Sequence, residues 1–333
     1  MKNDSSITVI VPAYNAEKTI EKCIDSIINQ TLSAHEIFVI NDGSVDNTTK
    51  ILKKYLNNKN IKIFNKNNEG VSLARNYGLD RVNSKYVAFV DSDDYIEKDF
   101  LEVLYNNLHS NKDVDLSICG VTHYNEPNKP KKYNTHYSRS GLHDSTETIE
   151  YLLSPNSPQG YLCNKLWKMS IIEQNNLRLD PKLNMAEDLL FTIFYLLKAK
   201  NVIISNQCLY NYMHKQDSLS SDLLLNNNQK KFLKTNQDFL IVCKRIIEIA
   251  PTSRIKRAAV VFWSRNASFF LRQLNLINFE GYSKLKKELL EQCKRNLRYV
   301  ICSNSMSLKN KFAYIGTIYF SRLIVIYDRN KRN

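Results

Sequence analysis

The sequence predicts an α/β fold, a mostly parallel sheet flanked by helices, followed by an all-helical basic C-terminal region. Three observations lead to this prediction. Up to residue 90, short runs of β-branched and aromatic residues alternate with amphipathic segments of helical period, which is typical of a parallel sheet. A polar or acidic turn follows each of these runs. After residue 226 the strand-like runs stop, and long basic segments of helical period begin.

The first four strands are expected at residues 7–12, 36–40, 62–64 and 85–90. Pro12 ends the first of them, because proline cannot donate a hydrogen bond to the sheet. Between the strands, residues 19–30, a segment ending near residue 56, and residues 70–79 have helical patterns. The first of these helices carries Ile20, Ile24 and Ile27 on one face. Strands and helices that alternate in this way imply parallel strands joined by right-handed crossovers.

The polar turns after these strands are expected to line one cleft. They comprise residues 14–15, 42–44, 68–70 and 91–94. Loops at the carboxyl edge of a parallel sheet converge, and ligands of open α/β sheets bind at that edge. The alternative is that each segment only supplies the residues that any turn prefers.

The most acidic of these turns holds three carboxylates, Asp91, Asp93 and Asp94, directly after the apolar run 86–90. Their mutual repulsion is tolerable around a divalent cation, and hard oxygen ligands suit Mg²⁺ or Mn²⁺ shared with substrate phosphates. The alternative is an Asp-rich turn that caps the following helix.

The middle of the chain is expected to continue with a helix at 97–108 and a strand at 115–121. Residues 122–145 are polar and indicate a partly flexible, acceptor-side excursion. Short strands are expected at 202–204 and 208–212. Glu187 and Asp188 precede an amphipathic run, so they begin a helix. They provide either a catalytic carboxylate or an ordinary acidic first turn favoured by the helix dipole.

The net charge of +14 is concentrated near the C-terminus, where residues 230–333 hold 22 Lys and Arg against 6 Asp and Glu. This asymmetry indicates an anionic partner surface. One helix places Arg254, Arg257, Arg265 and Arg272 opposite a broad apolar side. It is expected either to lie on a membrane or to dock on the catalytic domain. Scattered cysteines and the lack of a secretory or membrane-spanning run predict a cytoplasmic protein.

Four blocks of sequence together resemble the family-2 glycosyltransferases of the GT-A fold, of the bacterial surface-polysaccharide type. The blocks occur in the family's order, and the resemblance is dense over residues 5–110 and looser to about residue 220. They read Val9-Ile10-Val11-Pro12-Ala13-Tyr14-Asn15, Asn41-Asp42-Gly43-Ser44, Asn68-Glu69-Gly70-Val71-Ser72-Leu73-Ala74-Arg75-Asn76-Tyr77-Gly78 and Val90-Asp91-Ser92-Asp93-Asp94.

The resemblance implies an inverting transfer of a sugar from a nucleotide-diphosphate donor, expected to be UDP-linked, to a hydroxyl of a glycan or lipid-linked acceptor. It implies a Mn²⁺ or Mg²⁺ cofactor held by Asp93, and that Asp188 is the catalytic base. His214 replaces the family's more frequent Arg, and it is expected to act as a metal ligand, as a phosphate donor or only in structure. The implied nucleotide-binding residues are Pro12, Tyr14, Asp42, Arg75, Asp91 and Ser92.

The expected domains are a catalytic domain at 1–225 and a helical region at 226–333. The catalytic domain would comprise a nucleotide-sugar half to about residue 120 and an acceptor half at 121–225. The helical region would attach the protein to the anionic inner face of the plasma membrane, and it could also mediate oligomerisation.

Two other functions fit parts of the sequence. A metal-dependent nucleotidyltransferase should carry a Gly-rich, basic phosphate loop after the first strand, where this chain has residues 12–15, Pro-Ala-Tyr-Asn. A basic nucleic-acid-binding protein should interleave aromatic and basic residues on the sheet, whereas here the charge lies on helices outside the cleft. We therefore expect no nucleic-acid partner.

Overall fold

The computed structural model describes residues 6–111, 113–124, 132–155, 157–213, 229–276 and 282–321. The chain divides into two compact units. The first consists of Met1–Ile149 and Asn156–Ser218, and the second of Glu150–Pro155 and Leu219–Asn333. The expectation that residues 1–225 form the catalytic domain concerns function and stays a prediction.

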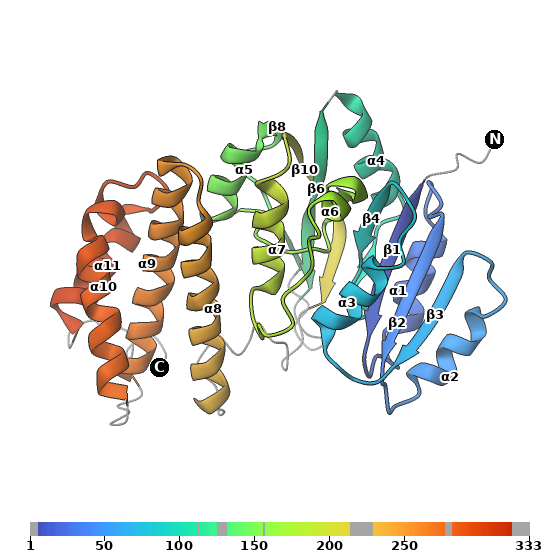
Figure 1. Ribbon diagram of the computed structural model, residues 1–333, viewed down its shortest axis with the longest axis horizontal. Helices are drawn as coiled ribbons and strands as arrows, with labels where there is room; N and C mark the ends of the chain where they lie inside the picture. Colours follow the sequence, from blue (N-terminus) through green and yellow to red (C-terminus); the bar gives the residue numbers. More distant parts are fainter. Residues whose placement is uncertain are drawn as a thin grey trace. The chain divides into compact units, whose positions relative to one another are not determined.

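The first unit is built on one sheet, to which ten strands of the described residues belong (Figure 1). They are β1 (Ile7–Ala13), β2 (Glu36–Asp42), β3 (Ile61–Lys66), β4 (Tyr86–Phe89), β5 (Tyr95–Ile96), β6 (Val114–Tyr124), β7 (Lys132–Asn134), β8 (Gly141–Asp144), β9 (Lys165–Lys168) and β10 (Asn201–Met213). The strand order is β3-β2-β1-β4-β9-β6-β10-β5, with β7 paired to β6 and β8 to β10.

The first four strands are parallel, as the sequence predicts. Strand β1 pairs in parallel with β2 and with β4, and β2 pairs in parallel with β3. The sheet is nevertheless mixed, because β9 lies antiparallel between β4 and β6. This four-residue strand was not expected, since so short a segment carries no periodic signal.

The middle of the chain is more regular than expected. The polar stretch 122–145 extends β6 to Tyr124 and supplies β7 and β8, so much of its described part is strand. Its role on the acceptor side stays a prediction. The two short strands expected at 202–204 and 208–212 are one strand, β10. Its pairing with β6 shifts register after Ile204 and again after Cys208. These irregularities accommodate the polar residues between the two apolar runs.

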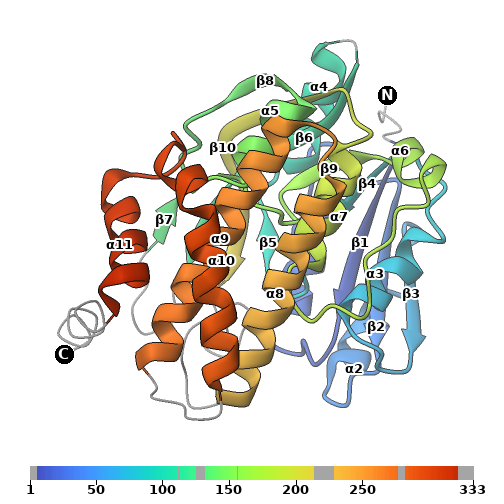
Figure 2. The same ribbon diagram turned by 60° about the vertical axis from the view of Figure 1, so that its left-hand side comes forward.

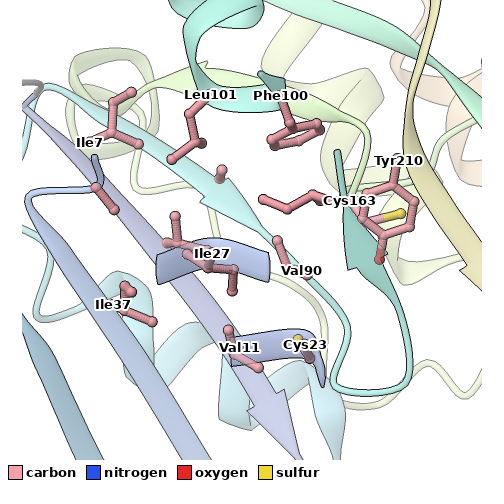
Figure 3. Packing of buried hydrophobic residues seen from close by; sticks show 14 of the residues in the cluster. Ile7, Val11, Cys23, Ile27, Ile37, Val90, Phe100, Leu101, Cys163 and Tyr210 are labelled. Carbon is pink, nitrogen blue, oxygen red and sulfur yellow. The ribbon is translucent and has the colours of Figure 1, made fainter. Parts of the chain in front are cut away.

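Helices cover both faces of the sheet. They are α1 (Ile20–Ile28), α2 (Thr48–Leu52), α3 (Val71–Leu79), α4 (Phe100–Ser110), α5 (Ser145–Leu152), α6 (Met169–Gln174) and α7 (Glu187–Leu196), and a 3₁₀ turn, Lys53–Tyr55, follows α2. Helices α1 and α4 pack on one face, where Ile27 and Leu101 meet Val11 and Val90 (Figure 3). Helix α3 packs on the opposite face, because Gly78 lies close against Ile10.

In its described residues 229–276 and 282–321, the second unit consists of helices joined by short non-helical connections, as predicted. Helices α8 (Gln229–Ile249), α9 (Ser253–Leu276) and α10 (Ser283–Ile301) lie side by side, and α11 (Leu308–Tyr319) packs on α9 and α10 (Figure 2). No helix of the described residues is long and apolar enough to cross a membrane.

The apolar side of α9 is buried within the second unit. Phe262, Trp263 and Phe270 are buried, and α9 contacts α8 and α10. The Phe270 ring lies edge-on to Phe232 of α8, with centroids 5.7 Å apart. Its apolar residues form the core of its own unit, so the expectation that this side lies on a membrane was wrong. Docking of the helix on the catalytic domain stays a prediction.

Candidate active site

The loops that follow β1 and β2 are tied together by hydrogen bonds. The Asn15 amide donates to the Ser44 hydroxyl at 3.0 Å, and the Val45 amide donates to the Asn15 side-chain oxygen at 2.9 Å. The Ala16 amide donates to Thr48 Oγ1 at 2.8 Å. Asn15 has a φ of 48°, a left-handed conformation that asparagine tolerates. Tyr14 is held in this double loop with about half of its surface exposed.

Asp42, the last residue of β2, fastens the β3–α3 loop. Its buried carboxylate accepts hydrogen bonds from Lys66 Nζ at 2.6 Å and from the Glu69 and Gly70 amides at 3.1 and 2.8 Å. Gly70 has a φ of 95°, in the region that strongly favours glycine. One buried carboxylate therefore sets the shape of the third polar loop.

Arg75 of α3 connects the acidic turn after β4 to helix α7. Its Nη2 donates to Asp91 Oδ1 at 2.8 Å, and its Nη1 lies 3.3 Å from Glu187 Oε1. Burial disfavours the charge of this guanidinium, but Asp91 and then Glu187 outweigh that effect, so the pKa of Arg75 is raised. Arg75 is thus a buried, permanently charged link between two acidic segments.

The acidic turn is anchored from its other side by β10. Asp94 is buried, and it accepts a hydrogen bond from the Tyr210 hydroxyl at 2.6 Å and one from the Met213 amide at 2.8 Å. Burial, followed by the charges of Asp93 and Asp91, raises the pKa of Asp94 well above its usual range. The three carboxylates therefore lie close enough to perturb one another.

Asp188 lies in the first turn of α7, next to the Glu187 that pairs with Arg75. Its Oδ1 accepts a hydrogen bond from the Leu189 amide at 2.7 Å. Burial of Asp188, and next the charge of Glu187, raise its pKa, whereas the charge of Arg75 lowers it. Together these effects give Asp188 a pKa of about 7. A carboxylate with this pKa is suited to accept a proton near neutral pH.

Helix α7 is positioned by a close backbone contact. A Cβ on Gly160 would lie 2.3 Å from Leu189 Cα, so only glycine allows this approach. Thr192 Oγ1 also donates to the Gly160 carbonyl at 2.9 Å. The buried Lys165 holds the same turn, because its Nζ donates to the Tyr161 carbonyl and, at 2.8 Å, to Asn164 Oδ1. Burial lowers the pKa of Lys165 to about 8.

The structure brings most of the predicted site residues to the same edge of the sheet. Pro12 is buried near the end of β1, and Ser92 and Asp93 lie in the partly exposed turn after β4. Asp42 holds the loop that leads into α3, and Arg75 of that helix pairs with Asp91. His214, predicted as a metal ligand, lies outside the described residues.

Sequence reasoning missed the residues that hold this site in place. Tyr210 and Asp94 are 116 positions apart in the chain, and no local pattern signals such a pairing. Gly160 stands in a polar loop without a motif. Lys165 gave the one available signal, because a lysine within an apolar strand needs partners for its ammonium group.

The donor set at the acidic turn fits a hard divalent cation. Among the described residues no group of three or more acidic, His or Cys side chains forms a complete metal site. Mg²⁺ and Mn²⁺ commonly bind to one or two carboxylates and take their other ligands from substrate phosphates and water. Asp93, with the Asp91 oxygen that does not meet Arg75, would supply such a pair.

Comparison with known proteins gives the same family as the motifs. The model of "Glycosyl transferase family 2" matches residues 8–175. "Glycosyltransferase GlyA" of Streptococcus pneumoniae is 35% identical over 65% of this chain and 32% of its own length. The "Cholesterol galactosyltransferase" of Borreliella burgdorferi is 31% identical over 70% of this chain and 67% of its own.

TarP of Staphylococcus aureus, a "Poly(ribitol-phosphate) beta-N-acetylglucosaminyltransferase", is 32% identical over 66% of this chain and 65% of its own. The match therefore spans about a third of GlyA and about two thirds of the other two relatives. Among solved structures, TarS 1–349 of S. aureus superposes with a TM-score of 0.69 at 22% identity, covering 98% of this chain and 91% of that one. The chain therefore belongs to glycosyl transferase family 2, and it is built on the GT-A fold.

Proposed function

We propose that this enzyme transfers a sugar, with inversion, from a UDP-linked donor to a hydroxyl of a surface polysaccharide or lipid-linked glycan. The observation that carries the proposal is the ionic link from Asp91 through Arg75 to Glu187, with contacts of 2.8 and 3.3 Å. It holds the acidic turn beside the helix that bears Asp188, so the donor side and the acceptor side of one reaction lie next to each other.

The donor nucleotide would bind across the tied loops after β1 and β2. The half-exposed Tyr14 ring is available for the base to stack on. Asp42 already accepts three hydrogen bonds, and a carboxylate has about four acceptor positions. It would therefore shape the base pocket and have about one position left for the base. TarS 1–349 has been crystallised with UDP-GlcNAc, which supports a UDP-sugar as the donor.

The diphosphate would lie at the acidic turn, near Asp91, Ser92 and Asp93. Mn²⁺ or Mg²⁺ held there by Asp93 and Asp91 would act as a Lewis acid that neutralises the departing diphosphate. Arg75 was predicted to bind the nucleotide, but its guanidinium is buried between Asp91 and Glu187. Its proposed role is to hold Asp91 and α7 in position.

Asp188 would act as the general base. As the acceptor oxygen attacks the anomeric carbon, the bond to the UDP oxygen breaks on the opposite face, and the hydroxyl proton moves to the Asp188 carboxylate. A pKa of about 7 leaves a substantial fraction of this group ionised at neutral pH, while making it basic enough to accept that proton.

The relatives and the charge support the proposed acceptor and location. TarP acts on poly(ribitol phosphate) according to its name, and a polyanionic or lipid-linked acceptor suits a chain with 22 basic and 6 acidic residues after residue 229. The enzyme would work as a peripheral protein on the cytoplasmic face of the membrane. Self-association through the second unit stays a prediction.

The test is a panel of nucleotide sugars in a hydrolysis assay, combined with thermal unfolding. UDP-glucose, UDP-galactose and their N-acetyl forms are compared with GDP-mannose, each with and without Mn²⁺. We expect slow, Mn²⁺-dependent release of UDP from one UDP-sugar, and a raised Tm with UDP plus Mn²⁺. Protection by GDP but not by UDP would contradict the proposed donor. Full activity of Asp93→Asn would contradict the proposed metal site.

A further inference from the structure

Helix α11 carries an exposed apolar stripe on its outer side, formed by Leu308, Phe312, Ile315 and Tyr319. Three of these side chains are far more exposed than large apolar residues usually are, at 73% for Leu308, 70% for Phe312 and 55% for Tyr319. At 3.6 residues per turn the four residues of the stripe fall within about 60° of one another around the helix. Phe320, directly after the helix, is 58% exposed and extends the stripe.

The opposite side of α11 is firmly packed. Tyr314 and Ile318 are buried, and the Tyr314 hydroxyl donates to the Cys293 carbonyl of α10 at 2.8 Å. The Ser307 hydroxyl caps the helix by accepting a hydrogen bond from the Asn310 amide. The α11 stripe is therefore an apolar face presented by an anchored helix.

Exposed basic side chains lie on α11 and on α10, the helix on which it packs. Lys309 is exposed on α11, and Arg295 and Arg298 are exposed near the end of α10. Tyr299 and Ile301, in the last turn of α10, add exposed apolar surface. An apolar, aromatic face together with exposed basic residues is the pattern of helices that lie in the interface of an anionic membrane.

We propose that the α11 stripe inserts in the plane of an anionic lipid surface and holds the enzyme there. This inference names the surface through which the enzyme would contact the membrane. It rests on the proposed function only for the location of the enzyme at a membrane. A second copy of the chain is a less favourable occupant, because two strongly basic units would bring like charges together around the contact. Anionic headgroups would compensate that charge, and the acyl region would bury the apolar side chains.

The experiment measures co-sedimentation of the full chain with vesicles of phosphatidylcholine, alone or mixed with phosphatidylglycerol. The test variant combines Leu308→Ser, Phe312→Ser and Tyr319→Ser. The matched control combines Leu56→Ser, Tyr133→Ser and Leu142→Ser, because these first-unit residues are comparably exposed, at 65%, 49% and 50%. Unchanged melting of both variants shows that each is folded.

We expect the wild-type chain to bind the anionic vesicles. The partition coefficient of the stripe variant should be lower by at least about tenfold. The control should bind like the wild type, and high salt should weaken binding. Equal partitioning of the stripe variant, or no binding by the wild type, would overturn the inference. A wild-type dimer that the stripe variant dissociates would reassign the stripe to self-association.

Hydrolysis of the donor sugar without vesicles separates this inference from the proposed function. If the stripe variant loses vesicle binding but still hydrolyses the UDP-sugar, the result supports both the membrane inference and the proposed function. Intact hydrolysis with unchanged vesicle binding by the stripe variant removes only the present inference. Vesicle binding through the stripe by a wild-type enzyme that hydrolyses no nucleotide sugar would instead remove the proposed donor.

Discussion

Replacing Asp188 by asparagine should slow sugar transfer while making the folded protein more stable above neutral pH. Asparagine has nearly the same size, and its side-chain oxygen can still accept the 2.7 Å hydrogen bond from the Leu189 amide. It cannot accept the proton of the acceptor hydroxyl. General base catalysis contributes about 10²- to 10⁴-fold, so kcat should fall by that factor while UDP binding is retained.

The pH profile tests the same group in the wild-type enzyme. Burial raises the pKa of Asp188 to about 7, and only the ionised carboxylate can act as a base. The transfer rate should therefore be constant above about pH 8 and fall by about tenfold per pH unit below pH 7. A carboxylate with its ordinary pKa would keep the rate constant down to about pH 5.

The stability effect has the opposite sign. The folded-state pKa of Asp188 is higher than the unfolded value of 3.8, so the protonated form favours folding. That contribution is complete below pH 3.8 and is lost as the pH rises to about 7. Three pKa units correspond to about 4 kcal/mol. Partial exposure and coupling to Arg75 reduce this to about 1–2 kcal/mol, or a Tm difference of a few degrees.

The assay compares acceptor-dependent UDP release and thermal unfolding at pH 5 and pH 8. Asp188→Asn should melt higher than the wild type at pH 8, with a smaller difference at pH 5. Glu173→Gln serves as the control, because this exposed acid at the end of α6 lies outside the proposed site. Retained transfer by Asp188→Asn would move the base elsewhere, and a lower Tm at pH 8 would refute the buried-charge reasoning.

Three further substitutions test other parts of the site. Asp93→Asn should keep the wild-type Tm but lose Mn²⁺-dependent transfer by at least about 10²-fold, as a Mn²⁺ titration of the rate would measure; an unchanged titration curve would exclude Asp93 as a ligand. Arg75→Gln should destabilise the fold by about 3–5 kcal/mol in urea unfolding, since it leaves two partly buried carboxylates uncompensated; an unchanged midpoint would refute a structural role for the link. Gly160→Ala should cost about 1–3 kcal/mol and lower kcat, because its Cβ would displace α7; wild-type kinetics would show that the position of α7 is not critical.

Local sequence patterns were sufficient to predict the part of the sheet in which strands alternate with helices. Strands β1, β2 and β4 have buried apolar runs, β3 is only partly buried, and each of the four is followed by a turn whose composition marks its end. The convergence of the polar loops then followed from parallel topology alone. Strand β9 could not be found in this way, because its position between β4 and β6 depends on pairing with segments far away in the chain.

The contacts that fix the site were beyond the reach of local patterns. Arg75 and Glu187 are 112 positions apart, and each alone is an ordinary residue of a helix. The motif therefore indicated Arg75 but not its partner, and the sequence assigned it to the nucleotide. Likewise, the amphipathic pattern of α9 was read correctly as a helix, but periodicity cannot say which surface will cover the apolar side.

The charge balance of the site argues that the diphosphate and a cation must bind together. The acidic turn 91–94 and the first turn of α7 carry five carboxylates, and Arg75 is the cation that pairs with two of them. The pKa values of Asp94 and Asp188 are raised, but Asp91, Asp93 and Glu187 alone carry more negative charge than one guanidinium compensates. A diphosphate approaching this turn would be repelled unless a divalent ion came with it. UDP without Mn²⁺ should therefore protect the enzyme from unfolding much less than UDP with Mn²⁺.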